Sequence, residues 1–210
     1  TVKCGTDVVF ENIKNNAAVS ATGNIPDSDD CAGGIVGNLE KGTVKNCVNY
    51  GSVDGKGLKD SHLGGMVGNL SNGKAIMNNY QTSLEFTNCV NYGAIINGRR
   101  LGGMAGTAEC ATTFTNCINF GWIDCGISNA EIAGGINGFA DNDTVAYYNC
   151  VNLGYVKGAT YAGGIMGYCR ANLEAVAIID GCVNLGAVYT GSQCAGGIAG
   201  YSAAPITITN

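Results

Sequence analysis

The chain has 210 residues, of which 34 are glycine and only 2 are proline, and its formal net charge is −5. Charged residues make up 13% of the chain, about half the usual share, and Lys and Arg form no basic face with interleaved aromatics, so we expect no nucleic-acid binding. Glycine shows no three-residue period, which excludes collagen, and no apolar run approaches the roughly 18 residues of a membrane-spanning helix.

Along the chain, one glycine-bearing phrase occurs six times, with starts 29 to 38 residues apart. The copies read AGGIVG from Ala32, LGGMVG from Leu63, LGGMAG from Leu101, AGGING from Ala133, AGGIMG from Ala162 and AGGIAG from Ala195. Self-similarity at this period indicates a stacked array in which no single unit buries its own apolar face. The paired glycines permit a tight corner and close approach of the backbone.

A second phrase lies between these copies. It reads NCVNYG from Asn46 and from Asn88, NCINFG from Asn116, NCVNLG from Asn149 and GCVNLG from Gly181, with a degenerate first copy at 12–17. Each unit then contains three short expected strands: one that begins at an apolar-x-Asn triplet such as Val44-Lys45-Asn46, one at a Gly-x-Val triplet such as Gly51-Ser52-Val53, and one at the paired glycines. Segments this short and this rich in Gly and β-branched residues favour strands over helices.

These patterns predict an all-β fold, a right-handed parallel β-helix of about six coils that occupies residues 1–210 as a single repeat domain. The chain opens and closes inside the repeat pattern, because Thr207–Asn210 matches Thr43–Asn46. We therefore expect a fragment of a longer protein, which continues or is capped beyond Asn210. Exposed strand edges at the ends of the fragment could join copies end to end.

Equivalent residues of a parallel β-helix form columns with a spacing of about 4.8 Å. The asparagine column is complete, and its members are Asn15, Asn49, Asn91, Asn119, Asn152 and Asn184. Because an amide both donates and accepts, stacked copies can satisfy one another as a ladder. The alternative is that Asn merely tolerates a left-handed turn.

Two apolar columns flank these asparagines. Val48, Val90, Ile118, Val151 and Val183 follow the cysteines, and Tyr50, Tyr92, Phe120, Leu153 and Leu185 follow the asparagines. Since Cys and Val are adjacent, either a corner separates them or one column faces outward. An outward aromatic column would form a stripe that binds sugars or a partner, with Tyr50, Tyr92 and Phe120 as the candidate binding residues. The alternative is that these side chains only cover the edge of the coil.

Five of the eleven cysteines occupy one repeat position: Cys47, Cys89, Cys117, Cys150 and Cys182. The first copy has Ile13 there, which favours a small apolar core site over a disulfide. Stacked side chains point the same way, so their Cβ atoms stay farther apart than the roughly 3.8 Å of a disulfide. We predict mostly free, buried thiols. No CxxC pair occurs, so no zinc site and no other metal or cofactor is expected.

The combined strings GIVGNLEKGTVKNCVNYGSVDG (34–55), GINGFADNDTVAYYNCVNLGYVKG (135–158) and GIMGYCRANLEAVAIIDGCVNLGAVYTG (164–191) resemble the GLUG repeat. This resemblance covers nearly the whole chain. It departs from the commoner pattern in having Val-Asn-aromatic after Cys. GLUG repeats form non-catalytic regions of large bacterial surface proteins, including IgA1-specific metallopeptidases and adhesin-like proteins. The resemblance therefore implies an extracellular or cell-surface setting and carries over no catalytic residue, and the HExxH zinc motif is absent.

Candidates for catalysis are few. His62 is the only histidine, and its repeat position varies freely, which suits a surface or edge site without a catalytic role. Asp27, Asp29 and Asp30, or Asp141 and Asp143, could act as an acid–base pair on a glycosidic bond, although acidic surface turns are the usual explanation for such residues. The insertion between Gly68 and Asn88, with Ala75–Tyr80 at its centre, is the best candidate for a binding loop.

The sequence thus predicts a non-enzymatic structural or adhesive domain that acts as a rigid spacer or a ligand-binding stalk. Its expected partner is a host or bacterial surface protein or a glycan. The alternatives are a carbohydrate-binding or polysaccharide-cleaving β-helix, and an accessory domain of a surface metallopeptidase.

Overall fold

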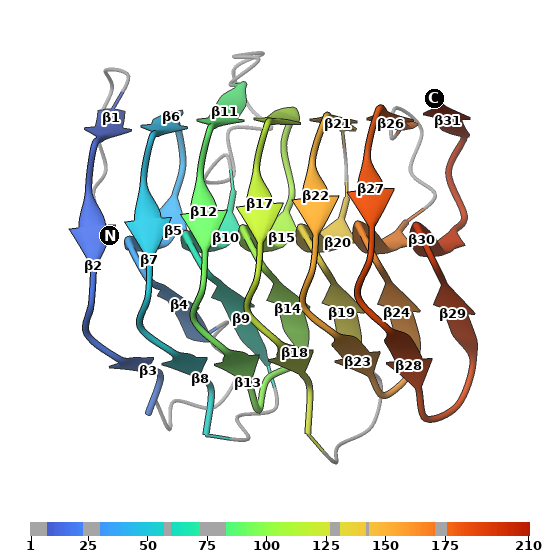
Figure 1. Cartoon of the computed structure of the whole chain (residues 1–210), viewed down its shortest axis with the longest axis horizontal. Coiled ribbons are helices and arrows are strands. Elements are labelled where there is room, and N and C mark those ends of the chain that lie inside the picture. Colours follow the sequence, from blue (N-terminus) through green and yellow to red (C-terminus); the bar gives the residue numbers. More distant parts are fainter. Residues whose placement is uncertain are drawn as a thin grey trace, which may run out of the picture.

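The computed structural model describes residues 8–22, 30–56, 60–71, 83–126, 131–141, 143–170 and 176–210, and all regular structure among them is β-strand. Each coil of the chain carries five strands, and each strand pairs in parallel with its equivalents in the neighbouring coils. Figure 1 shows the coils side by side along the long axis, from β1–β5 at the blue end to β31 at the red end. No helix in the described part of the chain is long and apolar enough to cross a membrane.

The first three strands of each coil belong to the sheets that we call A, B and C. Sheet A stacks β1 (Val8–Glu11), β6 (Gly42–Lys45), β11 (Leu84–Thr87), β16 (Thr112–Thr115), β21 (Thr144–Tyr148), β26 (Val176–Asp180) and β31 (Ile206–Thr209). Sheet B stacks β2 (Lys14–Asn15), β7 (Val48–Asn49), β12 (Val90–Asn91), β17 (Ile118–Asn119), β22 (Val151–Asn152) and β27 (Val183–Asn184). Sheet C stacks β3 (Val19–Ser20), β8 (Val53–Asp54), β13 (Ile95–Ile96), β18 (Ile123–Asp124), β23 (Val156–Gly158) and β28 (Val188–Thr190).

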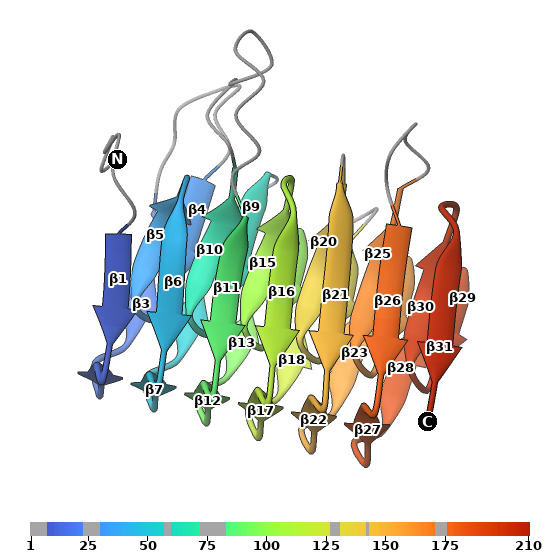
Figure 2. The ribbon, with the colours of Figure 1, turned by 90° about the horizontal axis from the view of Figure 1, so that it is seen from above.

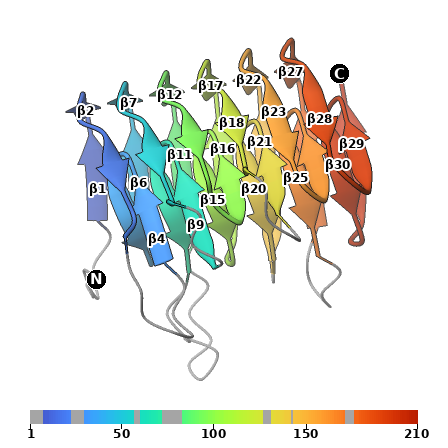
Figure 3. The ribbon, with the colours of Figure 1, turned by 90° about the horizontal axis from the view of Figure 1, so that it is seen from below.

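The last two strands of each coil lie on either side of the paired glycines and form sheets D and E. Sheet D stacks β4 (Asp30–Gly33), β9 (Ser61–Gly64), β14 (Arg100–Gly102), β19 (Ile132–Gly134), β24 (Tyr161–Gly163) and β29 (Cys194–Gly196). Sheet E stacks β5 (Val36–Leu39), β10 (Val67–Leu70), β15 (Ala105–Ala108), β20 (Asn137–Ala140), β25 (Met166–Cys169) and β30 (Ala199–Ser202). The sheets follow one another around the coil, as Figures 2 and 3 show from opposite sides.

The parallel β-helix that the repeats predict is confirmed, and its stacked strands, seven in sheet A and six in each of the other sheets, span about five turns, close to the expected six coils. The register follows the repeated phrases, since Val44, Phe86 and Phe114 are direct partners in sheet A. The expectation of three strands per coil was too low. The paired glycines divide one expected strand into two, and the asparagine of the apolar-x-Asn triplet divides another.

That asparagine has a left-handed backbone conformation. Asn12, Asn46, Asn88, Asn116 and Asn149 have φ between 52° and 58°, and Gly181 stands in the same place with φ 62°. Asparagine and glycine are the residues that adopt this conformation at least cost. The strand of sheet A therefore ends one residue before it rather than beginning there. In the sequence, the signal for this left-handed turn is Gly181, which stands where the other copies have asparagine.

Strict alternation follows the turn. Cys47 and Asn49 are fully buried, Val48 is half-buried and Tyr50 is 46% exposed. No corner therefore separates Cys from Val, and the Val and aromatic columns both face outward while the Cys and Asn columns face inward.

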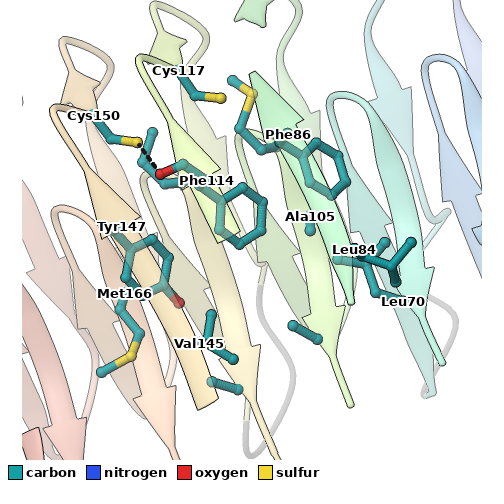
Figure 4. Packing of buried hydrophobic residues seen from close by; sticks show 14 of the residues in the cluster. Leu70, Leu84, Phe86, Ala105, Phe114, Cys117, Val145, Tyr147, Cys150 and Met166 are labelled. Atoms are coloured by element: carbon teal, nitrogen blue, oxygen red, sulfur yellow. Dashed lines mark hydrogen bonds between the residues drawn. The ribbon is translucent and has the colours of Figure 1, made fainter. Parts of the chain in front are cut away.

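The interior contains two apolar cores. The larger one lies between sheets A and E and includes Phe86, Phe114 and Tyr147, whose rings stack with centroids 4.8 and 5.4 Å apart. Figure 4 shows this stack beside Cys117 and Cys150. The smaller core lies between sheets C and D and includes Leu63 and Ile95. Burial of one large apolar side chain stabilises the folded chain by about 1.5–3 kcal/mol. Both cores therefore contribute to stability at every coil.

The paired glycines bring the backbone against the asparagine column. A Cβ placed on Gly103 would lie 2.5 Å from Asn119 Cγ and 2.2 Å from the carbonyl oxygen of Gly135. Gly103 has no positive φ, so close approach is what requires glycine here. The second glycine of each pair therefore leaves room for the asparagine column, which lies between the two cores.

Candidate functional site

The asparagine column is a continuous ladder of hydrogen bonds through the interior. Asn49 Nδ2 donates to Asn91 Oδ1 over 2.9 Å, and the same bond of 2.8 Å links Asn91 to Asn119 and Asn119 to Asn152. The ladder also includes Asn15 at one end and Asn184 at the other. Each amide nitrogen makes a second bond to the carbonyl oxygen two residues later, as from Asn119 to Gly121 at 2.8 Å. The geometry favours the ladder, and the left-handed turn belongs instead to the preceding asparagine of the phrase.

The cysteine column lies beside the larger core. Cys47, Cys89, Cys117 and Cys150 are free thiols, and all four are fully buried. Their thiols donate to backbone carbonyl oxygens, as from Cys150 Sγ to Phe114 at 3.5 Å (Figure 4). Burial raises the pKa of the Cys117 thiol well above its ordinary value, so it stays protonated. These cysteines serve as small apolar side chains with a weak donor.

The outward aromatic column has its ring faces covered. Tyr50 and Tyr92 stack with centroids 4.9 Å apart and planes 5° apart, and Tyr92 and Phe120 stack at 4.7 Å and 8°. The Lys14 ammonium lies 4.8 Å from the centre of the Tyr50 ring, on its other side along the column. Both faces of Tyr92 are therefore occupied by neighbouring rings, and only ring edges are exposed. A sugar packs against the face of an aromatic ring, so the Tyr92 ring offers no open face to a sugar.

His62 is not at the surface, which corrects the expectation of a surface or edge position. Its side chain is fully buried, and its Nε2 lies 3.1 Å from Arg100 Nη1. Outward side chains of sheets D and E face one another across the glycine corner and cover each other, as where the Arg100 guanidinium lies 4.2 Å from the centre of the Phe139 ring. Desolvation, followed by the positive charge of Arg100, lowers the pKa of His62 to about 3. The imidazole is therefore neutral at physiological pH.

The acidic candidates that the structure describes, Asp141, Asp143 and Asp30, each have their own surroundings. Asp141 is 5% exposed and makes an ion pair of 2.9 Å with Arg170 Nη1. Asp143 Oδ1 accepts a bond from the backbone N–H of Thr144 at 2.7 Å, and Asp30 lies in β4. Asp27, Asp29 and the expected binding loop Ala75–Tyr80 lie outside the described residues. Within the described ranges, no group of three His, Cys, Asp or Glu side chains could hold a metal ion.

A second group of outward residues was missed at the level of sequence. It comprises Trp122, Asp124, Tyr155, Lys157 and Tyr189 on the outer face of sheet C, and the last four of these line a groove of about 470 Å³. The signal was available, because Trp122 is the only tryptophan and stands at the variable centre of a Gly-x-Ile triplet. The equivalent residues in the adjacent coils differ from Trp122 in size and type, so the sequence shows no repeated column at this position.

Comparisons of the chain with family models, curated proteins and solved structures found no match. The resemblance to the GLUG repeat therefore stays a prediction from the repeated phrases.

Proposed function

We propose that this chain is a non-enzymatic structural and adhesive repeat domain of a bacterial cell-surface or secreted protein, in which it acts as a rigid spacer or a ligand-binding stalk. The asparagine ladder is the observation that carries the spacer role. Its bonds of 2.8–2.9 Å join every coil to the next through the middle of the molecule. Bending the stack would lengthen these buried bonds on one side, at a cost of about 1 kcal/mol for each bond lost.

The resemblance to the GLUG repeat supports the surface setting. The columns support this role, since the ladder asparagines and the cysteines face inward and hold the coils together, whereas outward positions such as Trp122 and its equivalents Ala94 and Tyr155 differ from coil to coil. Such a stack can keep its inner structure while its outer surface takes on different ligands.

The distance distribution between two labels at opposite ends tests the spacer role. Lys45 in β6 and Thr209 in β31 occupy the same column of sheet A, five strand spacings apart, so their backbones should lie about 24 Å apart. Spin labels are introduced there as non-canonical amino acids, because thiol chemistry would be ambiguous in this chain. A single narrow distribution near that distance is expected at every temperature below unfolding. A broad or bimodal distribution in the folded protein would refute a rigid spacer.

A further inference from the structure

The outer face of sheet C carries an aromatic pair, Trp122 and Tyr155, and the neighbour of Trp122 on its other side along the column is an alanine. Trp122 and Tyr155 are equivalent residues of adjacent coils, with centroids 5.7 Å apart and ring planes at 81°. The equivalent residue in the coil before Trp122 is Ala94, and in the coil after Tyr155 it is Ala187. A methyl group covers little of an aromatic ring at this spacing. Trp122 is 50% exposed and Tyr92 is 45% exposed, so the two differ in their neighbours rather than in exposure, because the Tyr92 ring has an aromatic neighbour on each side.

Polar groups stand beside this pair in the next outward column. Asp124, Lys157 and Tyr189 are equivalent residues of three successive coils. Asp124 Oδ2 accepts from Lys157 Nζ over 3.1 Å and from the Tyr155 hydroxyl over 3.3 Å. Tyr155 and Tyr189 meet edge to face, with centroids 6.5 Å apart and planes at 76°. The groove therefore combines aromatic walls with one anionic and one cationic hydrogen-bonding group, whose charges cancel.

We propose that this groove is a binding site for a neutral saccharide chain. The C–H-rich face of a pyranose ring packs on an aromatic ring, and its neighbouring hydroxyl groups both donate and accept hydrogen bonds. Asp124 accepts from one hydroxyl while Lys157 donates to the next. Tyr155 and Tyr189 form the wall of the groove, and Trp122, which lies against Tyr155 beside the groove, supplies a ring face to a chain that extends past Tyr155. Paired opposite charges attract no excess of cationic or anionic groups, which selects an uncharged sugar.

An apolar protein segment fits the groove less well than a sugar. It would cover the Asp124–Lys157 pair without replacing the water that hydrates it, and burying charged groups without hydrogen-bond partners is unfavourable. Sugar hydroxyls replace that water directly. Mixed linings of aromatic faces with a few placed polar groups are the usual form of small-molecule sites.

Trp122 is the only tryptophan of the chain, so its fluorescence reports directly whether the groove is occupied. We expect the fluorescence of Trp122 to change saturably when cellohexaose, chitohexaose or maltohexaose is added, with at least one of the three binding with a Kd of about 1 mM or tighter. Bound sugar should also protect Trp122 from acrylamide quenching. A uronic-acid hexasaccharide should bind at least tenfold more weakly than the best neutral sugar.

Variants distinguish this groove from the rest of the surface. Trp122→Ala and Asp124→Asn should each weaken binding at least tenfold by calorimetry, with far-UV circular dichroism and the urea midpoint checking the fold. Should Trp122→Ala fail to fold, Asp124→Asn alone carries the test. Tyr92→Ala, an exposed aromatic with covered faces, is the matched control and should leave the affinity within about twofold.

Four outcomes would overturn the proposal. The first is no response of Trp122 to any neutral hexasaccharide up to about 10 mM. The second is equal loss of affinity in Tyr92→Ala and in the groove variants, and the third is exclusive binding of the uronic-acid sugar. The fourth is a sugar-independent blue shift of Trp122 with rising protein concentration, which would assign the groove to a protein contact. The proposal deepens the adhesive part of the proposed function, and the spin-label distances test the spacer part separately.

Discussion

Replacement of Asn119 by leucine should be among the most damaging single changes in the interior. Asn119 donates to Asn152 Oδ1 and to the carbonyl oxygen of Gly121, and it accepts from Asn91 Nδ2, each over 2.8 Å. Leucine offers none of these groups. It leaves an N–H of Asn91 and the Oδ1 of Asn152 buried without a partner, since both residues are fully buried.

The expected cost follows from those groups. A buried polar group that loses its partner costs roughly 1–3 kcal/mol, so two or three of them give a loss of about 3–5 kcal/mol in the free energy of unfolding. Asn15→Leu is the matched control at the end of the ladder. Asn15 is only half-buried and makes its one inter-coil bond to Asn49, so its removal leaves a single buried acceptor and should cost about 1–2 kcal/mol.

Urea unfolding followed by far-UV circular dichroism measures both losses, with the slope m checked for a change in cooperativity. A loss at Asn119 that exceeds the loss at Asn15 by at least about 1 kcal/mol is expected. Equal losses, or a loss at Asn119 below about 0.5 kcal/mol, would refute the argument that the ladder bonds stabilise the stack.

Three further changes test the interior and the corner. Cys117→Val should cost less stability than Cys117→Ala in urea melts, because valine refills the apolar site, and a coloured thiol reagent should label Cys117 only after unfolding. Tyr147→Phe should cost about 1–3 kcal/mol, because Asn137 Nδ2 donates to the Tyr147 hydroxyl over 2.9 Å in the core, and the added change Asn137→Val should recover most of that loss. The folded pKa of His62 is about 3 and its ordinary pKa when unfolded is near 6.5, so only the unfolded state takes up the proton as the pH falls. The free energy of unfolding should therefore be nearly constant above about pH 7.5 and fall by roughly 1.0–1.3 kcal/mol per pH unit between pH 6 and 5. His62→Gln should flatten that window, and a wild-type curve that is level from pH 7 to 5 would contradict the burial of His62.

The inward half of the fold was readable from the sequence because stacking repeats it. A residue that faces inward contacts its own equivalents in the coils above and below. Asn49 and Cys47 therefore recur from coil to coil and reveal the length of the repeat. The same logic located the glycine corner. It did not locate the left-handed turn at Asn46, because one phrase holds two asparagines and only Gly181 separates their roles.

The outward half was less readable, because its structure depends on contacts between columns rather than within one. His62 varies to Arg100 and Ile132 in the next two coils, which resembles a surface position. It is buried because sheets D and E fold face to face at the glycine corner, a contact that no repeat records. Trp122 and Lys157 were missed for the same reason, since they belong to neighbouring columns of different composition.

The contrast between the two aromatic groups shows how a β-helix can control binding at its surface. Every outward side chain has equivalents one strand spacing away on both sides, so the neighbours in its column decide whether its face is open. Aromatic neighbours cover the faces of Tyr92, and the ring becomes part of the wall. The alanine neighbour Ala94 leaves the Trp122 ring without a stacked partner on that side, where we propose that it contacts a saccharide. On a stack whose interior is fixed by asparagine, cysteine and glycine, an exchange of one outward residue for alanine is therefore enough to open a ring face without disturbing a single inward contact.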